Sequence, residues 1–237
     1  MSNRVIWVAA FIGIVACCVS CSFPHRIKGN GNLVTSEKTV SEFEKVNISN
    51  SAEVRFHASQ EYRAVVTVDE NLAEYVEIAT KGNVLNIGTK SGSYSFTKFL
   101  IEIYCPILTG VSVSGSGNFR NMDKISVSTF ETSVSGSGKI DGTIECENFS
   151  ARISGSGKIV VAGNSKKADI GISGSGKFDG NDFVISNATV HISGSGKIDV
   201  HVTDNLNAHV SGSGGINYRG EPKIDSKVSG SGRIRKL

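Results

Sequence analysis

The stretch that decides the fold is Val134-Ser-Gly-Ser-Gly-Lys-Ile-Asp141, one copy of a motif that occurs seven times. Ser-Gly-Ser-Gly begins at Ser114, Ser135, Ser154, Ser173, Ser193, Ser211 and Ser229, at intervals of 21, 19, 19, 20, 18 and 18 residues. Each copy follows Val or Ile, and Phe or Ile comes two positions after its last glycine. Self-similarity at a short period is typical of repeat architectures, in which every copy occupies the same place in successive structural units.

The motif itself has the alternation of a β-strand, in which residues two apart share a face. We expect four residues to point inward: Val134, Gly136, Gly138 and Ile140. The residues between them should face water: Ser133, Ser135, Ser137 and Lys139. Glycine is disfavoured in strands, so the 27 glycines of the chain need a positional reason, either close approach of the opposite wall or a bend in the strand.

The segments between the motif copies are also strand-like, for example 124–127 and 183–185, and show no helical spacing. Parallel pairing of successive copies then predicts coils stacked along an axis. The predicted fold is all-β, a right-handed parallel β-helix (a solenoid) with coils of about 18–21 residues and an irregular N-terminal β cap. The drifting interval argues against a left-handed β-helix with a strict six-residue unit. An antiparallel meander, with Gly-Ser-Gly in hairpin turns, is the remaining alternative.

The sequence divides into a leader, a tether and one domain. We predict a lipoprotein signal peptide at 1–20, a tether at 21–29 and a single β-helix domain at 30–237, with the cap and irregular coils at 30–110 and the repeats at 111–237. In the cap, strands are expected at 45–48, 53–57, 64–69, 84–88 and 99–104, with one helical turn at 71–76. At the far end, Arg233, Arg235 and Lys236 would guard the last strand edge by their charge.

The N-terminal segment is typical of an export signal. Arg4 precedes an apolar run over 5–19, which is short for a membrane span and is followed by cysteines. Ser20-Cys21 resembles the cleavage site of bacterial lipoproteins, with Cys21 lipidated, and Ala16-Cys17 is the alternative site. The expected location is the outer membrane, lipid-anchored on its periplasmic or surface face. An ordinary cleaved signal or an N-terminal anchor helix is the competing interpretation.

The repeated Val/Ile-Ser-Gly-Ser-Gly-Lys-Ile-Asp coils resemble a known family. Together with the Gly29-Asn-Gly31 and Phe43-Glu-Lys-Val46 opening, they are similar to the putative auto-transporter adhesin head GIN domain found in envelope lipoproteins of Bacteroidetes. The resemblance covers about 30–235. It implies a β-helix outside the cytoplasm and an adhesin-like role, and it implies no catalytic residues.

A column of lysines is the first candidate for binding. If the motifs stack, the position after each motif places basic residues on successive coils: Lys139, Lys158, Lys177, Lys197 and Arg233. This basic stripe could bind anionic glycans or lipid headgroups. The alternative is a solvated face, with Asp141, Asp179 and Asp199 offsetting the charge two positions later.

Other groups favour structural interpretations. Serine columns would form hydroxyl ladders along the axis. His191 and His209 would share a column, but two imidazoles make only half a metal site. Cys105 and Cys146, on coils about 9–10 Å apart, are expected to be free, buried thiols. Gly171–Lys177 superficially matches a phosphate-binding loop, but Phe178 and a strand follow it in place of Ser/Thr and a helix.

The expected function is that of a non-enzymatic, cell-envelope lipoprotein acting as an adhesin-like binding or structural module. No catalytic residue, metal or cofactor is predicted. The expected partners are the membrane through the lipid anchor, a glycan or other envelope or host-surface ligand, and a second copy of the chain. The net charge of +3 gives no signal for nucleic acid. The alternative function is a polysaccharide lyase or hydrolase on the same scaffold, which would require converging carboxylates.

Overall fold

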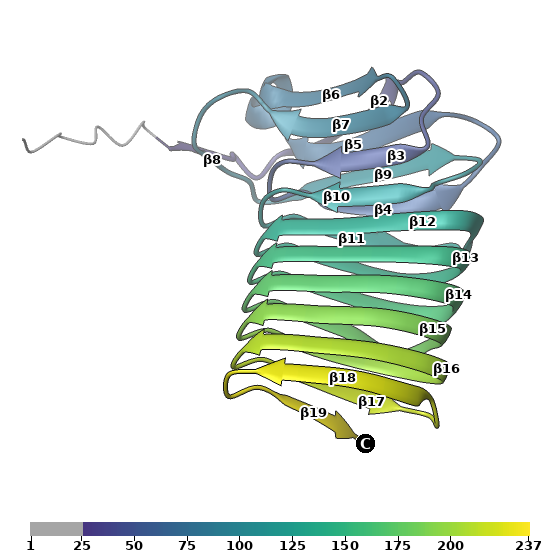
Figure 1. Ribbon diagram of the computed structural model, residues 1–237. Helices are drawn as coiled ribbons and strands as arrows, with labels where there is room; N and C mark the ends of the chain where they lie inside the picture. Colours follow the sequence, from purple (N-terminus) through teal and green to yellow (C-terminus); the bar gives the residue numbers. More distant parts are fainter. Residues whose placement is uncertain (1–25) are drawn as a thin grey trace, which may run out of the picture.

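The computed structural model describes residues 26–237, and the chain forms a β-solenoid of about seven turns with coils of about 19 residues, joined to an N-terminal mixed sheet (Figure 1). The chain descends from the mixed sheet towards its C-terminus and winds right-handed in Figure 1. Neighbouring coils pair in parallel throughout the repeats. The predicted solenoid is therefore confirmed, and the antiparallel meander is excluded.

The pattern of buried residues in one coil shows where the chain bends. In β13 (Lys139–Gly155), the buried side chains are Ile140, Ile144, Cys146, Phe149, Ala151 and Ile153. The alternation is interrupted at Gly142, which is only half-buried, and its period of two is broken between Cys146 and Phe149, which indicates a bend at each place. The coil thus has a back wall before the first bend, a short side, and a front wall that runs from 148 to 155.

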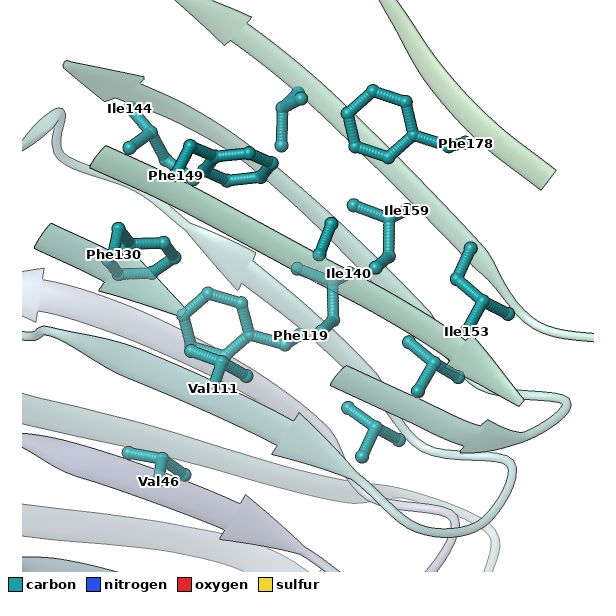
Figure 2. Packing of buried hydrophobic residues seen from close by; sticks show 14 of the residues in the cluster. Val46, Val111, Phe119, Phe130, Ile140, Ile144, Phe149, Ile153, Ile159 and Phe178 are labelled. Atoms are coloured by element: carbon teal, nitrogen blue, oxygen red, sulfur yellow. The ribbon is translucent and has the colours of Figure 1, made fainter. Parts of the chain in front are cut away.

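The same three sides recur in the long strands β14 (Lys158–Gly174), β15 (Lys177–Gly194) and β16 (Lys197–Gly212). The shorter strand β12 (Ile125–Gly136) begins opposite Ile144 and supplies only a short side and a front wall. The apolar side chains of all sides meet inside in one continuous cluster. Figure 2 shows part of it, with Val111, Phe119, Ile140 and Ile159 packed between the walls.

The Ser-Gly-Ser-Gly motif forms the corner between the front wall and the next back wall. In the copy that begins at Ser193, Gly194 has φ +123°, which L side chains rarely adopt. A Cβ on Gly196 would lie 2.6 Å from Ile172 Cγ2 and 3.0 Å from the Gly176 carbonyl oxygen, because the neighbouring coil packs directly against it. Both glycines are therefore required by geometry, the first by the bend and the second by the lack of space.

One part of the predicted alternation is wrong. Gly136 does not point into the core with Val134 and Gly138; it is half-exposed, and a Cβ there would meet the Gly115 carbonyl oxygen of the preceding coil. The reason is the corner, which rotates the backbone between Val134 and Gly138. Ser135 and Ser137 are exposed, as expected.

The residues by which the repeats differ in length lie outside the motif corner. Between β14 and β15, and between β15 and β16, the register shifts fall at Val160/Ala162, Gly180/Val184 and Ile185/Asn187. From there to the motif, the front walls stay in register, with Asn187 opposite Asn205 and Gly194 opposite Gly212. The intervals of 20 and 18 residues thus reflect a longer and a shorter turn at the short side.

The N-terminal region caps the solenoid in an order that differs from the chain order. Its strands are β1 (Ile27–Lys28), β2 (Leu33–Thr39), β3 (Lys45–Ile48), β4 (Glu53–Ala58), β5 (Arg63–Asp69), β6 (Val76–Lys81), β7 (Val84–Thr89), β8 (Tyr94–Ser95) and β9 (Phe99–Cys105). The first coil, β3 and β4, lies between the cap strands β7 and β9 on one side and β10 and β11 on the other. The chain thus builds one coil, forms the cap above it, and returns below it.

Antiparallel pairing distinguishes the cap from the coils. β5 pairs antiparallel with β2 and β9, and β6 pairs antiparallel with β7. The predicted helical turn is a 3-10 helix at Glu70–Tyr75 (η1), which buries Leu72. Asp69, with its side chain fully buried, accepts hydrogen bonds from the backbone N–H groups of Gly31 (2.9 Å) and Thr97 (2.7 Å). It thereby ties the N-terminal segment to the cap.

The repeats begin with β10 (Gly110–Val113) and β11 (Asn118–Asn121) and end with β17 (Gly215–Arg219), β18 (Lys223–Ser229) and β19 (Arg233–Lys236). β19 is the last strand of the back wall, so Arg233, Arg235 and Lys236 do stand on an edge. The predicted signal peptide and the two candidate lipidated cysteines lie outside the described residues. Within residues 26–237, no helix has the length and apolar character needed to cross a bilayer.

Candidate functional site

A shallow groove of about 470 Å³ with a mainly apolar floor lies on the front wall, where it is formed by five successive coils. We call it the front groove. Its lining residues come from β12 to β16: Thr129, Glu131, Asn148, Phe149, Ser150, Lys167, Ala168, Asp169, Asn187, Ala188, Thr189, Asn205 and Asn207. The groove therefore runs along the solenoid axis, across the strands.

The floor of the front groove follows one inward column, in which register partners are Phe130, Phe149, Ala168, Ala188 and Leu206. The side chains in this column become smaller, from phenylalanine to alanine, in the middle of the groove. The Phe149 ring lies 4.9 Å from that of Phe183 and 6.1 Å from that of Phe178, both on β15.

Two outward columns form the rims. One contains Thr129, Asn148, Lys167, Asn187 and Asn205, and the other contains Glu131, Ser150, Asp169, Thr189 and Asn207. Asn205 Nδ2 donates to Asn187 Oδ1 at 2.7 Å. In the part of the chain that the structure describes, the side chains of Asn148, Asn207 and Lys167 make no hydrogen bond to protein.

The carboxylates at the rim are already paired with cations. Lys45 Nζ lies 2.7 Å from Glu131 Oε2, and the Arg152 guanidinium forms an ion pair with Asp169. Lys167 occupies the middle of its column, between Asn148 and Asn187, and has no ion-pair partner within residues 26–237. The groove thus contains one uncompensated positive charge.

A second hollow of about 280 Å³ continues the front groove towards the cap. It shares Glu131 and Ser150 with the front groove, and Lys45, Ser133 and Arg152 line it further along. Gly110 and Gly171 supply no side chain on this wall. The front wall is therefore hollowed over more than the five coils of the groove itself.

The lysines of the predicted basic stripe do stack on the back wall, where Lys139, Lys158, Lys177, Lys197, Gly215 and Arg233 are successive register partners. Most of their charge is offset nearby. Lys139 Nζ lies 2.7 Å from Asp141, and Lys177 lies 3.1 Å from Asp179. The hydrogen bond to Asp179 raises the pKa of Lys177, although partial burial opposes it.

The aspartates on the back wall are held by these lysines and by neighbouring polar groups. Burial acts to raise the pKa of Asp141, but hydrogen bonds from Lys139 and Arg120 outweigh it and hold that pKa below its usual value. Asp199 is more enclosed: its side chain is 4% exposed, and it is contacted by Lys177, Lys197 and Asn217. Lys158 is the stripe lysine without an ion pair among the described residues, because its own strand carries Val160 where the neighbouring strands carry Asp141 and Asp179. The arrangement is that of a charge-balanced ladder.

The chain matches the family model "Putative auto-transporter adhesin, head GIN domain" over residues 42–222. The chain belongs to this family. A solved structure described as a "putative lipid binding protein" from Parabacteroides distasonis is 30% identical, with a TM-score of 0.78, 90% of this chain and 99% of that chain covered. No curated protein matches the chain.

Two further solved structures are similar to the chain. A "putative adhesin" from Parabacteroides merdae is 27% identical, with a TM-score of 0.73 and 90% and 99% of the two chains covered. A "putative adhesin" from Bacteroides fragilis, 23% identical with a TM-score of 0.83 and 89% and 100% covered, shares the fold. The resemblance inferred from the motif is therefore confirmed.

The remaining predicted groups of this GIN-domain protein lie where the register places them. His191 and His209 are partners on neighbouring coils, but the His191 ring leans the other way, over Gly171. Within residues 26–237, no group of three or more His, Cys, Asp or Glu side chains is arranged to hold a metal ion.

The serine columns of the GIN-domain repeats are exposed at the motif corner, but they do not form the expected hydroxyl ladder. Among residues 26–237, no side-chain hydrogen bond joins Ser135, Ser154 or their equivalents; the bond between Ser133 Oγ and Ser112 Oγ, 2.8 Å, belongs to the neighbouring column. The bend at each first motif glycine turns the hydroxyls towards solvent.

Cys105 and Cys146 are free and buried, as predicted. Their placement differs from the expectation, because Cys105 is opposite Ala58 and β9 is separated from β13 by β4 and β11. Burial raises the pKa of the Cys105 thiol to about 12. The two thiols are therefore further apart than neighbouring coils would place them.

The front groove was not predicted from the sequence. The available signal was the pair of alanines, Ala168 and Ala188, at a position where the preceding repeats carry phenylalanine. Both alanines lie five residues before their motif copy, as Phe130 and Phe149 do, so a count back from the motif aligns them.

Proposed function

We propose that this GIN-domain protein is a non-enzymatic cell-envelope lipoprotein, anchored in the outer membrane through Cys21 or Cys17, that acts as an adhesin-like module and binds a glycan. The front groove is the observation that carries this proposal. It offers an open, elongated surface with an apolar floor and free amide groups, on a wall fixed by main-chain pairing from coil to coil. Such a surface suits binding of a long ligand without enclosing it.

The carboxylates near the groove support binding over hydrolysis. Glu131 and Asp169 are two coils apart, a separation of about 10 Å in a parallel sheet, and each is held by a cation. Glycoside hydrolysis needs one protonated and one ionised carboxyl on either side of the scissile bond. Here both carboxylates lie on the same wall of the solenoid, and each is already engaged by a cation, Lys45 or Arg152.

The first experiment tests the anchor. The full chain is expressed in a Bacteroidetes host fed with labelled fatty acid, beside the Cys21→Ser and Cys17→Ser variants. Label in the outer-membrane fraction that one substitution removes supports the proposal. An unlabelled protein in the soluble fraction would overturn the lipoprotein assignment.

The second experiment tests binding against catalysis. The full chain, solubilised in detergent, is applied to immobilised pectin, alginate, glycosaminoglycans and host-cell glycans, and the same mixtures are assayed for released oligosaccharides. Retention without release is the expected result. Released products would refute the non-enzymatic role, and failure to bind any glycan would refute the binding module.

A further inference from the structure

The extent of the front groove fits a linear polymer better than a compact ligand. Its rims contain register partners from five coils, Thr129 to Asn205, and four steps of about 4.8 Å make a track roughly 19 Å long. A peptide strand would need a free sheet edge for its main chain, whereas both sides of every strand in the groove from β13 to β15 are already paired. An acyl chain would need apolar walls, and both rims are polar.

The groups on the rims match the chemistry of sugars. Each asparagine presents two donors and an acceptor, which suits neighbouring hydroxyl groups on a ring. The side chains of Asn148 and Asn207 have no protein partner among the described residues, and Asn187 keeps its amide donors free. Ala168 and Ala188 give a floor that the C–H face of a sugar can cover without polar groups being left unpaired.

The charge of the groove then selects among glycans. Glu131 and Asp169 are compensated by Lys45 and Arg152, so Lys167 alone contributes a net charge at the centre of the track. The stripe lysines on the back wall differ, because Asp141, Asp179 and Asp199 balance most of them. An anionic group on the ligand would therefore be attracted to the front groove at Lys167.

We propose that the front groove binds an extended acidic glycan, with a carboxylate of the glycan paired with Lys167 Nζ and its hydroxyls hydrogen-bonded by the flanking asparagines. This inference rests on the proposed glycan-binding function and names the ligand class and the site. It assigns no role in ligand binding to the lysine stripe.

The test uses the full chain and two soluble probes of equal length, an oligogalacturonate and the same oligosaccharide with its carboxyl groups reduced to alcohols. Calorimetry should show that the acidic probe binds more tightly. Lys167→Gln should lower the affinity for the acidic probe by roughly tenfold, the value of one charge-assisted hydrogen bond, and remove the preference between the probes. Lys158→Gln, which removes an unpaired lysine from the back wall, is the matched control and should change nothing.

Two further variants separate the site from folding defects. Asn187→Asp keeps the oxygen that accepts the hydrogen bond from Asn205 but adds a negative charge beside Lys167. It should therefore weaken binding of the acidic probe and leave binding of the reduced probe unchanged. Asn148→Ala should remove a rim amide that has no protein partner among the described residues and weaken the binding of both probes, with circular dichroism confirming the fold. Equal effects of Lys167→Gln and Lys158→Gln, or equal affinity for both probes, would overturn the assignment to the front groove. A wild-type chain that binds other glycans but neither probe would overturn the acidic ligand and leave the binding module intact.

Discussion

The glycines of the motif corner provide the sharpest test of the fold. Gly196→Ala would place a Cβ 2.6 Å from Ile172 Cγ2, whereas carbon atoms in contact are separated by about 3.5 Å. The two coils must therefore move apart by roughly 0.9 Å, in a core whose parallel strands pair on both sides. Overpacking of this kind costs about 1–3 kcal/mol, and we expect Gly196→Ala to lower the free energy of unfolding by about 2 kcal/mol.

Gly194→Ala should cost more. Its φ of +123° is strained for any residue with a Cβ, at about 1–3 kcal/mol, and the new methyl group would also lie 2.6 Å from the Gly174 carbonyl oxygen. We expect a loss of about 3 kcal/mol, which is a large part of the stability of an ordinary domain.

Gly215→Ala is the matched control, because Gly215 directly follows the motif, yet the nearest atom to its added Cβ is the Arg233 carbonyl oxygen at 4.0 Å. It should be neutral or stabilise the fold by up to about 1 kcal/mol. Urea unfolding of the full chain, followed by far-ultraviolet circular dichroism, gives the three values. Equal stability of Gly196→Ala and Gly215→Ala would refute the close packing of coils at the corner.

Three other predictions concern buried groups. Because its pKa is about 12, the Cys105 thiol should resist alkylation at pH 8 in the folded protein and react in urea; rapid labelling of the native chain would contradict its burial. Burial acts to raise the pKa of Asp69, but hydrogen bonds from Thr97, Gly31 and Lys98 outweigh it. Its stabilising contribution should therefore be present at neutral pH and be lost as the pH falls through this lowered pKa. Urea unfolding from pH 3 to 7 should show a shallower decline for Asp69→Asn, and parallel profiles for the variant and the wild type would count against a role for these hydrogen bonds. Asp199→Ala should destabilise the fold by about 2 kcal/mol, because it strips a nearly buried carboxylate from its partners, and Asp141→Ala, with a more exposed side chain, by less than about 1 kcal/mol; equal losses in thermal unfolding would argue against that difference in burial.

The sequence was sufficient to predict the coils because the corner imposes a local and repeated requirement. Each motif copy carries glycines equivalent to Gly194 and Gly196, so the motif marks the position of each corner in the sequence. The cap was harder to predict, since β3 and β4 are followed in the chain by strands that pack on their far side. That order depends on contacts between distant segments, and strand patterns in 30–110 carry no sign of it.

The front groove was missed for a different reason. Its columns lie between the variable turns, near Gly180 and Val184, and the motif, where the register is constant. Counting from each motif copy gives the correct partners near the corner, such as His191 with His209. The same count gives the floor of the groove as well, but the repeat drew attention to the positions that stay constant.

Constant and variable positions have different physical origins in this protein. A feature that recurs from coil to coil, such as the motif glycines in every copy or the paired lysines and aspartates in several, is explained by stacking, because each coil must match its neighbours. A ligand must instead distinguish one part of the rod from another, and only departures from the repeat can supply that. Lys167 and Ala168 are such departures, since the neighbouring coils carry asparagine and, towards the cap, phenylalanine at those positions. The site with recognition chemistry is therefore expected where the repeat is broken, on the front wall, and not along its most regular column.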